Sequence, residues 1–285
     1  RTAFSPIAGL FQPGANAPMS GELRLGFTDN PINTPNLKLE VGNAEAKVRV
    51  GWMRSVSNIF HAFAIQSFIA EAAHKAGEDQ KDYLLKTIGP DRIVDVTEQG
   101  AEYDNYGADK ADYPLDIGRL RHVIEKVSAM AKWGRTLPKG RGLGIAAHRS
   151  FLTYVATVVE VEVSEQGDLN IIKAWSAIDA GTVVNTDTVK NQVQGGSIFG
   201  LTAALSDGIT FDNGRAQQSN FHNYRVPRMS DAPLEVDVEV IDSDAPPAGV
   251  GEPATPVFAP ALCNAIFAAC GKRIRQLPIG DQLKA

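Results

Sequence analysis

The sequence predicts an α+β fold in which helices come first and strands dominate the second half. Apolar residues recur at helical spacing through residues 57–77 and 116–133. After the glycine-rich stretch at 140–144, apolar and polar residues alternate as they do in strands. The chain has 285 residues, 44% of them hydrophobic. It is therefore long enough for a substantial core in one large domain or two ordinary ones.

Residues 1–50 are expected to form an extended arm, because prolines and glycines interrupt them at short intervals. Within this arm, residues 23–27 and 37–41 alternate as short strands would. So short an arm buries little surface by itself. We therefore expect it to wrap another part of the protein.

Residues 51–135 are expected to be mainly helical. A first helix, capped by Ser55 or Ser57, is predicted to end at Gly77. Its helical spacing places Phe60, Phe63 and Phe68 in the core. A short helical piece at 79–88, a surface excursion at 89–114 and an amphipathic helix at 116–133 are expected to follow.

Residues 136–285 are expected to form a second, α+β part. A hairpin is predicted from its turn residues Gln166-Gly167-Asp168, with strands at 154–163 and 169–178. The elements expected after it are a helix from Asp187 or Thr188 to about Leu205, a strand at 209–211 before an Asn213-Gly214 turn, a strand at 234–241 and a last helix beginning near Pro260.

The composition excludes several classes of function. The net charge is −5, from 28 basic and 33 acidic residues, and argues against a general nucleic-acid binder. Two cysteines are too few for an iron–sulfur cluster held by four thiolates of this chain. The five histidines show no zinc-ligand spacing. Gly140 to Gly144 precede strand-like sequence and lack the helix that a phosphate-binding loop needs.

The strongest local candidate for chemistry is Glu252 in Gly249-Val250-Gly251-Glu252-Pro253. The glycines permit close approach of another group, and Pro253 restricts the backbone of Glu252. A single carboxylate on a tight loop suits a general base. An ordinary turn glutamate has the same local sequence, so both interpretations stay open here.

Arg54 is a second candidate, because it follows Gly51-Trp52-Met53 where a loop enters a helix. A guanidinium beside helix N–H groups can hold an anion. An exposed arginine without a ligand is the alternative interpretation.

In order, these segments resemble the molybdenum-binding subunit of the xanthine oxidase family of molybdenum hydroxylases. They are most similar to the branch of isoquinoline 1-oxidoreductase beta subunits and related aldehyde-oxidising enzymes. The resemblance runs over almost the whole chain from about Asn36. It is carried by residues 50–56, 61–71, 140–146, 184–185, 192–201, 217–222, 249–253 and 259–266.

The resemblance implies a mixed α/β molybdopterin-binding fold that is the C-terminal part of a larger subunit. Residues 51–135 would belong to a first molybdopterin-binding subdomain, and residues 136–285 would form the second, which carries the Glu252 loop. The cofactor implied is molybdenum bound to molybdopterin cytosine dinucleotide, with the metal held by the pterin dithiolene and not by residues of this chain. Glu252 would be the general base that activates a water-derived oxygen.

The same resemblance implies which residues contact the cofactor or the substrate. These are Met53, Arg54, Ser55, Val56, Gln192, Gly195, Gly196, Phe199 and Gly251. Two departures from the family pattern are visible. Phe199 stands where many members have a glutamine, and the family's Gly-Gln-Gly pterin-binding segment is absent between Gly144 and Tyr154. The second departure favours the isoquinoline-type branch, in which that segment lies near the N-terminus of the subunit.

The implied partners follow from what this chain lacks. They are a polypeptide carrying the N-terminal half of the subunit, a small subunit with [2Fe-2S] clusters, a cytochrome c acceptor and a small-molecule substrate, either an aldehyde or an N-heteroaromatic. The expected location is the bacterial periplasm or the periplasmic face of the inner membrane, with the cytoplasm as the alternative. A non-catalytic assembly module of the same fold and a plain hydrolase or binding domain are the competing functional interpretations.

Overall fold

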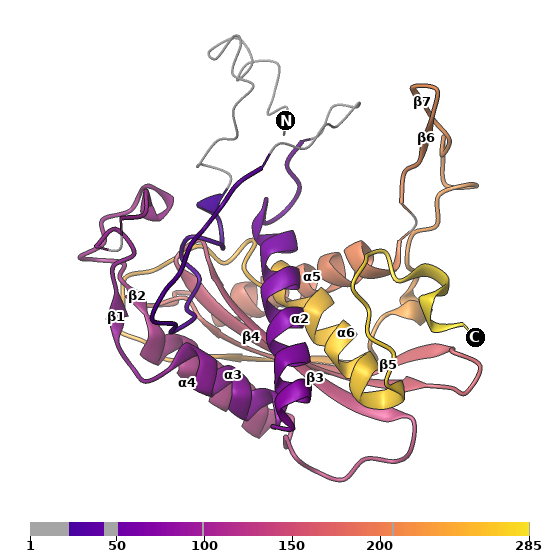
Figure 1. Cartoon of the computed structure of the whole chain (residues 1–285), viewed down its shortest axis with the longest axis horizontal. Helices are drawn as coiled ribbons and strands as arrows, with labels where there is room; N and C mark the ends of the chain where they lie inside the picture. The colour runs from indigo at the N-terminus through magenta and orange to yellow at the C-terminus, as the bar shows by residue number, and fades with distance from the viewer. Residues whose placement is uncertain (1–22, 43–50, 99, 207, 285) are drawn as a thin grey trace.

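A four-stranded sheet with helices on both faces forms the centre of the computed structural model, which describes residues 23–42, 51–98, 100–206 and 208–284 (Figure 1). The strand order is β3-β4-β5-β8. Strands β3 (Arg141–Ser150), β4 (Thr153–Val163) and β5 (Leu169–Asp179) are antiparallel neighbours, and β8 (Val236–Val240) lies parallel to β5. The predicted α+β class is confirmed.

Five α-helices surround this sheet in the described part of the chain. They are α2 (Asn58–Ala76), α3 (Gln80–Ile88), α4 (Ile117–Met130), α5 (Thr186–Leu205) and α6 (Thr255–Cys270). The short elements are β1 (Ile93–Val94), η2 (Asn105–Gly107), β2 (Leu115–Asp116), β6 (Phe211–Asp212), β7 (Arg215–Ala216), η3 (Met229–Asp231) and η4 (Gly280–Leu283). Strands β6 and β7 pair around the predicted Asn213-Gly214 turn, and Figure 1 shows this hairpin projecting from the body.

Side-chain caps explain where three of the helices begin. The carboxylates of Asp79 and Asp116 accept hydrogen bonds from the first N–H groups of α3 and α4. Asn185, two residues before the expected Asp187, caps α5 by accepting from the Thr188 N–H at 2.8 Å. Helix α6 begins at Thr255, five residues earlier than expected, because its proline at Pro260 is accommodated inside the helix.

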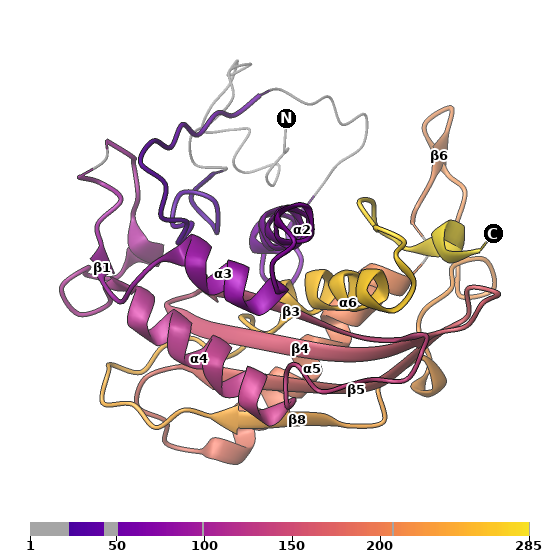
Figure 2. The ribbon, with the colours of Figure 1, turned by 60° about the horizontal axis from the view of Figure 1, so that its bottom comes forward.

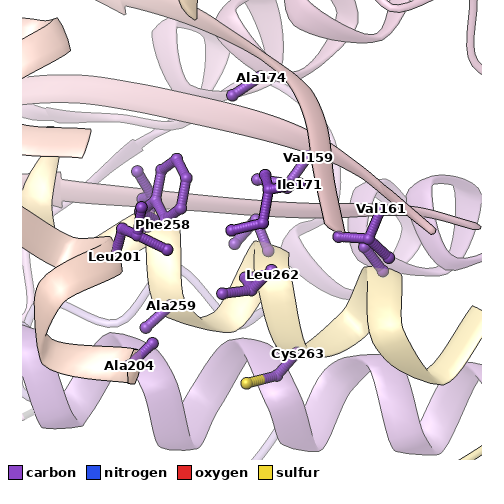
Figure 3. Packing of buried hydrophobic residues seen from close by; sticks show 14 of the residues in the cluster. Val159, Val161, Ile171, Ala174, Leu201, Ala204, Phe258, Ala259, Leu262 and Cys263 are labelled. Carbon is purple, nitrogen blue, oxygen red and sulfur yellow. The ribbon is translucent and has the colours of Figure 1, made fainter. Parts of the chain in front are cut away.

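The sheet separates two hydrophobic cores. Helices α5 and α6 pack on one face, where Phe258 and Leu262 meet Val159 and Ile171 of the strands (Figure 3). Helix α4 packs on the other face, against Tyr154 and its neighbours. Figure 2 shows α2 and α6 on one side of the sheet and α4 on the opposite side. Because β4 is buried on both faces, it is apolar along most of its length.

The glycine run at 140–144 allows α6 to lie directly on β3. A Cβ added at Gly144 would lie 2.1 Å from the Ala265 nitrogen and 2.3 Å from the Ala261 oxygen. A Cβ at Gly142 would lie 2.4 Å from the Ala265 oxygen. The strand already begins at Arg141, so these glycines are part of it. Their role is close packing of a helix backbone on a strand.

Two predictions about the N-terminal part are wrong. Residues 23–27 and 37–41 form turns and irregular chain and no strand, and Asp29 is instead buried in ionic contact with Arg149. Phe60 and Phe68 are 57% and 71% exposed, because the helix turns only its Ala62, Ile65 and Ile69 side inward. Only Phe63 of the three packs partly against the core.

The excursion at 89–114 is only partly a surface segment, since Val96 and Asn105 are buried. The remaining predicted elements, including the hairpin turn at 166–168 and the strand at 234–241, agree with the structure to within a few residues. Much of the predicted arm, residues 1–22 and 43–50, lies outside the described residues. The boundary near residue 135 stays a prediction.

Candidate functional site

Glu252 and Ser55, which are 197 residues apart in sequence, are hydrogen-bonded to each other. The Ser55 N–H donates to Oε1 of Glu252 at 3.1 Å, and the Ser55 hydroxyl donates to the Glu252 carbonyl oxygen at 2.7 Å. The Thr255 N–H, at the start of α6, donates to that same carbonyl oxygen at 3.0 Å. The Glu252 residue is therefore held at its backbone by two donors and at its carboxylate by a third.

Arg54 ties the same loop to helix α5. Its Nε donates to the Gly251 carbonyl oxygen at 2.7 Å, and its Nη2 donates to both the carbonyl oxygen and Oε1 of Gln192 at 3.1 Å. Burial lowers the pKa of Arg54 while the Glu252 carboxylate opposes this, and a guanidinium stays charged in either case. Arg54 thus holds the loop together, a role that neither sequence interpretation of this residue included.

The glycines of α5 serve two different purposes. A Cβ at Gly195 would lie 3.7 Å from Nη1 of Arg54, so this exposed glycine lies on the side of the site. Gly196 and Gly200 face α6 instead: an added Cβ would lie 3.0 Å from the Ala254 Cβ and 2.6 Å from the Thr255 oxygen, respectively. The pair lies in mid-helix and not at a helix start. Its second glycine brings α5 close to the helix that follows Glu252.

The loop that carries Arg54 and Ser55 has a costly backbone. A hydrogen bond from the Val56 N–H to the Met53 oxygen closes a tight turn, and Ser55 and Val56 have φ angles of 77° and 51°. Positive φ is rare outside glycine and is most unfavourable for a β-branched residue such as Val56. Such residues cost roughly 1–3 kcal/mol each and cluster at functional sites.

Two further left-handed pairs lie around the Glu252 loop. Phe151 and Leu152, with φ of 50° and 69°, form the two-residue turn between β3 and β4. The Gly249 N–H donates to the Phe151 oxygen at 3.3 Å, and the Phe151 ring lies 5.1 Å from the ring of Tyr106. Tyr106 itself has φ of 57°. Sequence analysis missed this turn, because Phe-Leu lacks the Asn or Gly that such turns usually contain.

Behind the Ser55 turn lies a buried polar cluster. Asn58, fully buried, accepts at Oδ1 from the Tyr106 hydroxyl at 3.3 Å and lies 2.9 Å from Nε2 of His148. Burial, with His61 and Arg149 nearby, lowers the pKa of His148 to about 3, so this imidazole is neutral. The cluster is a rigid support beneath the site.

The structure brings together Arg54, Ser55, Gln192, Gly195, Gly251 and Glu252 of the predicted site residues. Met53 is 50% exposed at the edge of the same turn and Val56 is half-buried within it. Phe199 is half-buried on α5, seven residues beyond Gln192. All nine cofactor contacts stay predictions.

The arrangement fits a cofactor that lies outside the protein core. A Cβ at Gly251 would meet no atom within 4 Å, so open space adjoins the loop next to Glu252. Among the described residues, no three His, Cys, Asp or Glu side chains gather as metal ligands. The donors offered here are an arginine, an amide and glycine backbone, which suit a polar organic cofactor.

Within the described part of the chain, every helix is too short or too polar to cross a lipid bilayer.

Comparison with known families gives a match over residues 57–233, to the molybdopterin cofactor-binding domain. Among curated proteins, the chain is 32% identical over 245 residues to the membrane-bound aldehyde dehydrogenase [pyrroloquinoline-quinone] of Gluconacetobacter polyoxogenes, covering 83% of this chain and 30% of the relative. It is 28% identical to the beta subunit of isoquinoline 1-oxidoreductase of Brevundimonas diminuta, covering 88% and 29%. A nicotinate dehydrogenase subunit of Pseudomonas putida is 28% identical, with 96% and 23% covered.

Among solved structures, the aldehyde oxidoreductase of Desulfovibrio desulfuricans aligns with a TM-score of 0.61 at 13% identity, covering 81% of this chain and 41% of that chain. At this identity the likeness concerns the fold. The chain spans between 23% and 30% of the length of the three curated relatives.

Proposed function

The chain belongs to the molybdopterin cofactor-binding domain family and is a portion of a molybdenum-binding subunit of the xanthine oxidase type, and from this premise we propose a catalytic role for it. It is the C-terminal part of a molybdenum hydroxylase that oxidises an aldehyde or hydroxylates an N-heteroaromatic compound with oxygen from water. The observation that carries this proposal is the anchored Glu252 carboxylate beside Arg54, Gln192 and the open space at Gly251.

Arg54, Gln192, Gly195 and the Gly251 backbone would contact the pterin part of the cofactor, which is a cytosine dinucleotide in this proposal. When bound, the cofactor supplies a metal that acidifies a bound water and takes up two electrons from the substrate. None of the four residues supplies a ligand to the metal itself. Their contribution is to orient the cofactor against the Glu252 loop.

Glu252 has the properties that a general base requires. Its Oε1 accepts the Ser55 N–H, while Oε2 accepts no hydrogen bond from any described residue. One oxygen therefore orients the carboxylate and the other is able to accept a proton. Arg54 nearby favours the ionised form of Glu252 by its positive charge. The proton moves from the activated water to Oε2.

The remaining parts of the enzyme lie outside this chain. The rest of the molybdenum-binding subunit would complete the cofactor site, because this chain matches less than a third of its curated relatives. A small [2Fe-2S] subunit would take the electrons, and a cytochrome c would accept them in turn. The periplasm is the compartment we propose for the assembly.

Replacing Glu252 by Gln in the assembled enzyme tests this function. Removing the base is expected to lower turnover about a hundredfold or more, because general-base catalysis contributes typically 10²–10⁴-fold. Molybdenum content is expected to stay unchanged. The exposed Glu165→Gln, at a hairpin carboxylate paired with Lys139, serves as the control. Undiminished turnover in Glu252→Gln would contradict the assignment.

The competing function is a non-catalytic assembly module that has kept the fold. It predicts that Glu252→Gln leaves the activity of the whole complex unchanged. Because one relative's name carries pyrroloquinoline quinone, the cofactor is tested separately by elemental analysis of the purified assembly. Molybdenum in stoichiometric amount supports the proposal, and quinone without molybdenum would exclude it.

A further inference from the structure

We propose that Ser55 is the positioning residue for Glu252, an inference that rests on the proposed function. Ser55 bonds to Glu252 twice, from its backbone N–H to Oε1 and from its hydroxyl to the carbonyl oxygen. The two bonds restrain both ends of the glutamate. They fix which carboxylate oxygen is occupied and which one is left to accept the proton.

The backbone of Ser55 shows why a serine at this position is informative. Ser55 is the third residue of the turn closed from Val56 to Met53, and its φ is 77°. This turn position favours glycine, which adopts positive φ without steric cost. A serine there carries a conformational penalty that glycine would avoid. What serine adds is the hydroxyl, and in this structure the hydroxyl binds the Glu252 backbone.

The neighbouring contacts keep the turn in this conformation. Arg54 binds the Gly251 oxygen, one residue before Glu252, and the Asn58 N–H donates to the Ser55 oxygen at 3.0 Å. Ser55 is fully buried, so its bonds to Glu252 are shielded from competing water. The turn is thus assembled around the glutamate from both sides.

The test compares three variants in the complete, molybdenum-loaded enzyme. Ser55→Gly keeps the backbone conformation and removes only the hydroxyl, and Ser55→Ala removes the hydroxyl and keeps the strain. Ser57→Ala is the matched control, because the Ser57 hydroxyl makes no capping hydrogen bond. We expect turnover per molybdenum to fall about tenfold in both Ser55 variants, with KM within about twofold of wild type, because misorientation of a base affects the chemical step. Ser57→Ala is expected to behave as wild type.

A second measurement needs no cofactor and uses the 285-residue chain. The amide resonance of Ser55 is expected to shift with pH as the Glu252 carboxyl ionises, and this shift is expected to vanish in Glu252→Gln. Hydrogen exchange at residues 251–253 is expected to accelerate about tenfold in Ser55→Gly. An unchanged titration of the Ser55 amide in Glu252→Gln would overturn the proposal.

Failure of this inference is distinguishable from failure of the proposed function. If Glu252→Gln abolishes turnover while Ser55→Gly keeps wild-type turnover, only the positioning role is overturned. If the Ser55 variants lose molybdenum but keep their turnover per molybdenum, Ser55 is merely structural and the inference is equally overturned. If Glu252→Gln retains turnover, the function itself fails, whatever the amide titration shows.

Discussion

At the scale of single residues, charges inside this protein are each faced by an opposite charge. Asp29 and Arg149, with side chains 0% and 1% exposed, approach to 3.5 Å on one face of the sheet. Asp179, at the end of β5, receives two hydrogen bonds from Arg119 of α4, at 2.6 and 2.8 Å. Such pairs are costly to form but more costly to break. They connect segments that are distant in the chain.

The Arg119–Asp179 pair makes stability depend on pH in a defined direction. Burial alone would raise the pKa of Asp179, but the hydrogen bonds from Arg119 and Gly181 outweigh burial and lower it below the ordinary value of 3.8. Because the folded-state pKa is the lower one, the ionised carboxylate stabilises the folded state. This contribution is present above the unfolded-state pKa and is lost as pH falls through the folded-state pKa.

Asp179→Asn is therefore expected to lower the free energy of unfolding by about 3 kcal/mol near pH 7, since it leaves Arg119 unpaired. The difference from wild type is expected to shrink as the pH approaches about 3. Urea unfolding at several pH values measures this. Asp281→Asn, at an exposed pair with Lys284, is the control and should change little. A difference independent of pH would contradict the assignment.

At the scale of elements, the packing of α6 decides where the Glu252 loop ends. Helix α6 lies on β3 at Gly142 and Gly144 and against α5 at Gly196 and Gly200, in each case close to a backbone. No side chain fits at these contacts. The start of α6 at Thr255 is thereby fixed, and with it the carbonyl of Glu252 that the Thr255 N–H binds.

Gly144→Ala is expected to destabilise the fold by about 3 kcal/mol or more, because its Cβ would overlap the backbone of α6 and overpacking alone costs typically 1–3 kcal/mol. Thermal or denaturant unfolding measures the loss. Gly42→Ala, where an added Cβ meets nothing within 4 Å, should stay within about 0.5 kcal/mol of wild type. Equal stability of the two variants would show that α6 does not lie against β3 in this way.

At the scale of the whole molecule, one sheet with a core on each face holds together the helical first part and the strand-rich second part. Residues of α2, α3 and α4 share a core with β3, β4 and β5. Yet the outer side of α2 presents Phe60 and Phe68 to solvent in this chain. Helical periodicity alone therefore marked more of α2 as core than this chain buries.

This difference in burial predicts unequal effects of two aromatic substitutions. Phe68→Ser is expected to change the free energy of unfolding by no more than about 0.5 kcal/mol, because the ring is 71% exposed. Phe258→Ala is expected to cost about 3–5 kcal/mol, because that ring is fully buried between α6 and the sheet. Calorimetry on the 285-residue chain measures both. A large loss in Phe68→Ser would show that the ring is buried after all.

The sequence alone determined the fold class, most element positions and the choice of Glu252. Periodicity and turn residues are local signals, and they located α4, the β4–β5 hairpin and β8 to within a few residues. The ordered motifs, through their family resemblance, singled out Glu252 and the Arg54 loop. Local patterns also misplaced Phe60 and Phe68, since periodicity reports that a face is apolar and not what covers it.

Only the tertiary structure decided how the site is assembled. Ser55 and Glu252 are 197 residues apart, and no local pattern records that a serine hydroxyl will meet that carbonyl. The left-handed turns at Ser55 and Phe151 contradict local preference and persist because surrounding contacts hold them. Periodicity in the sequence follows from the geometry of each element by itself. The site depends on contacts between elements, which exist only once the chain has folded.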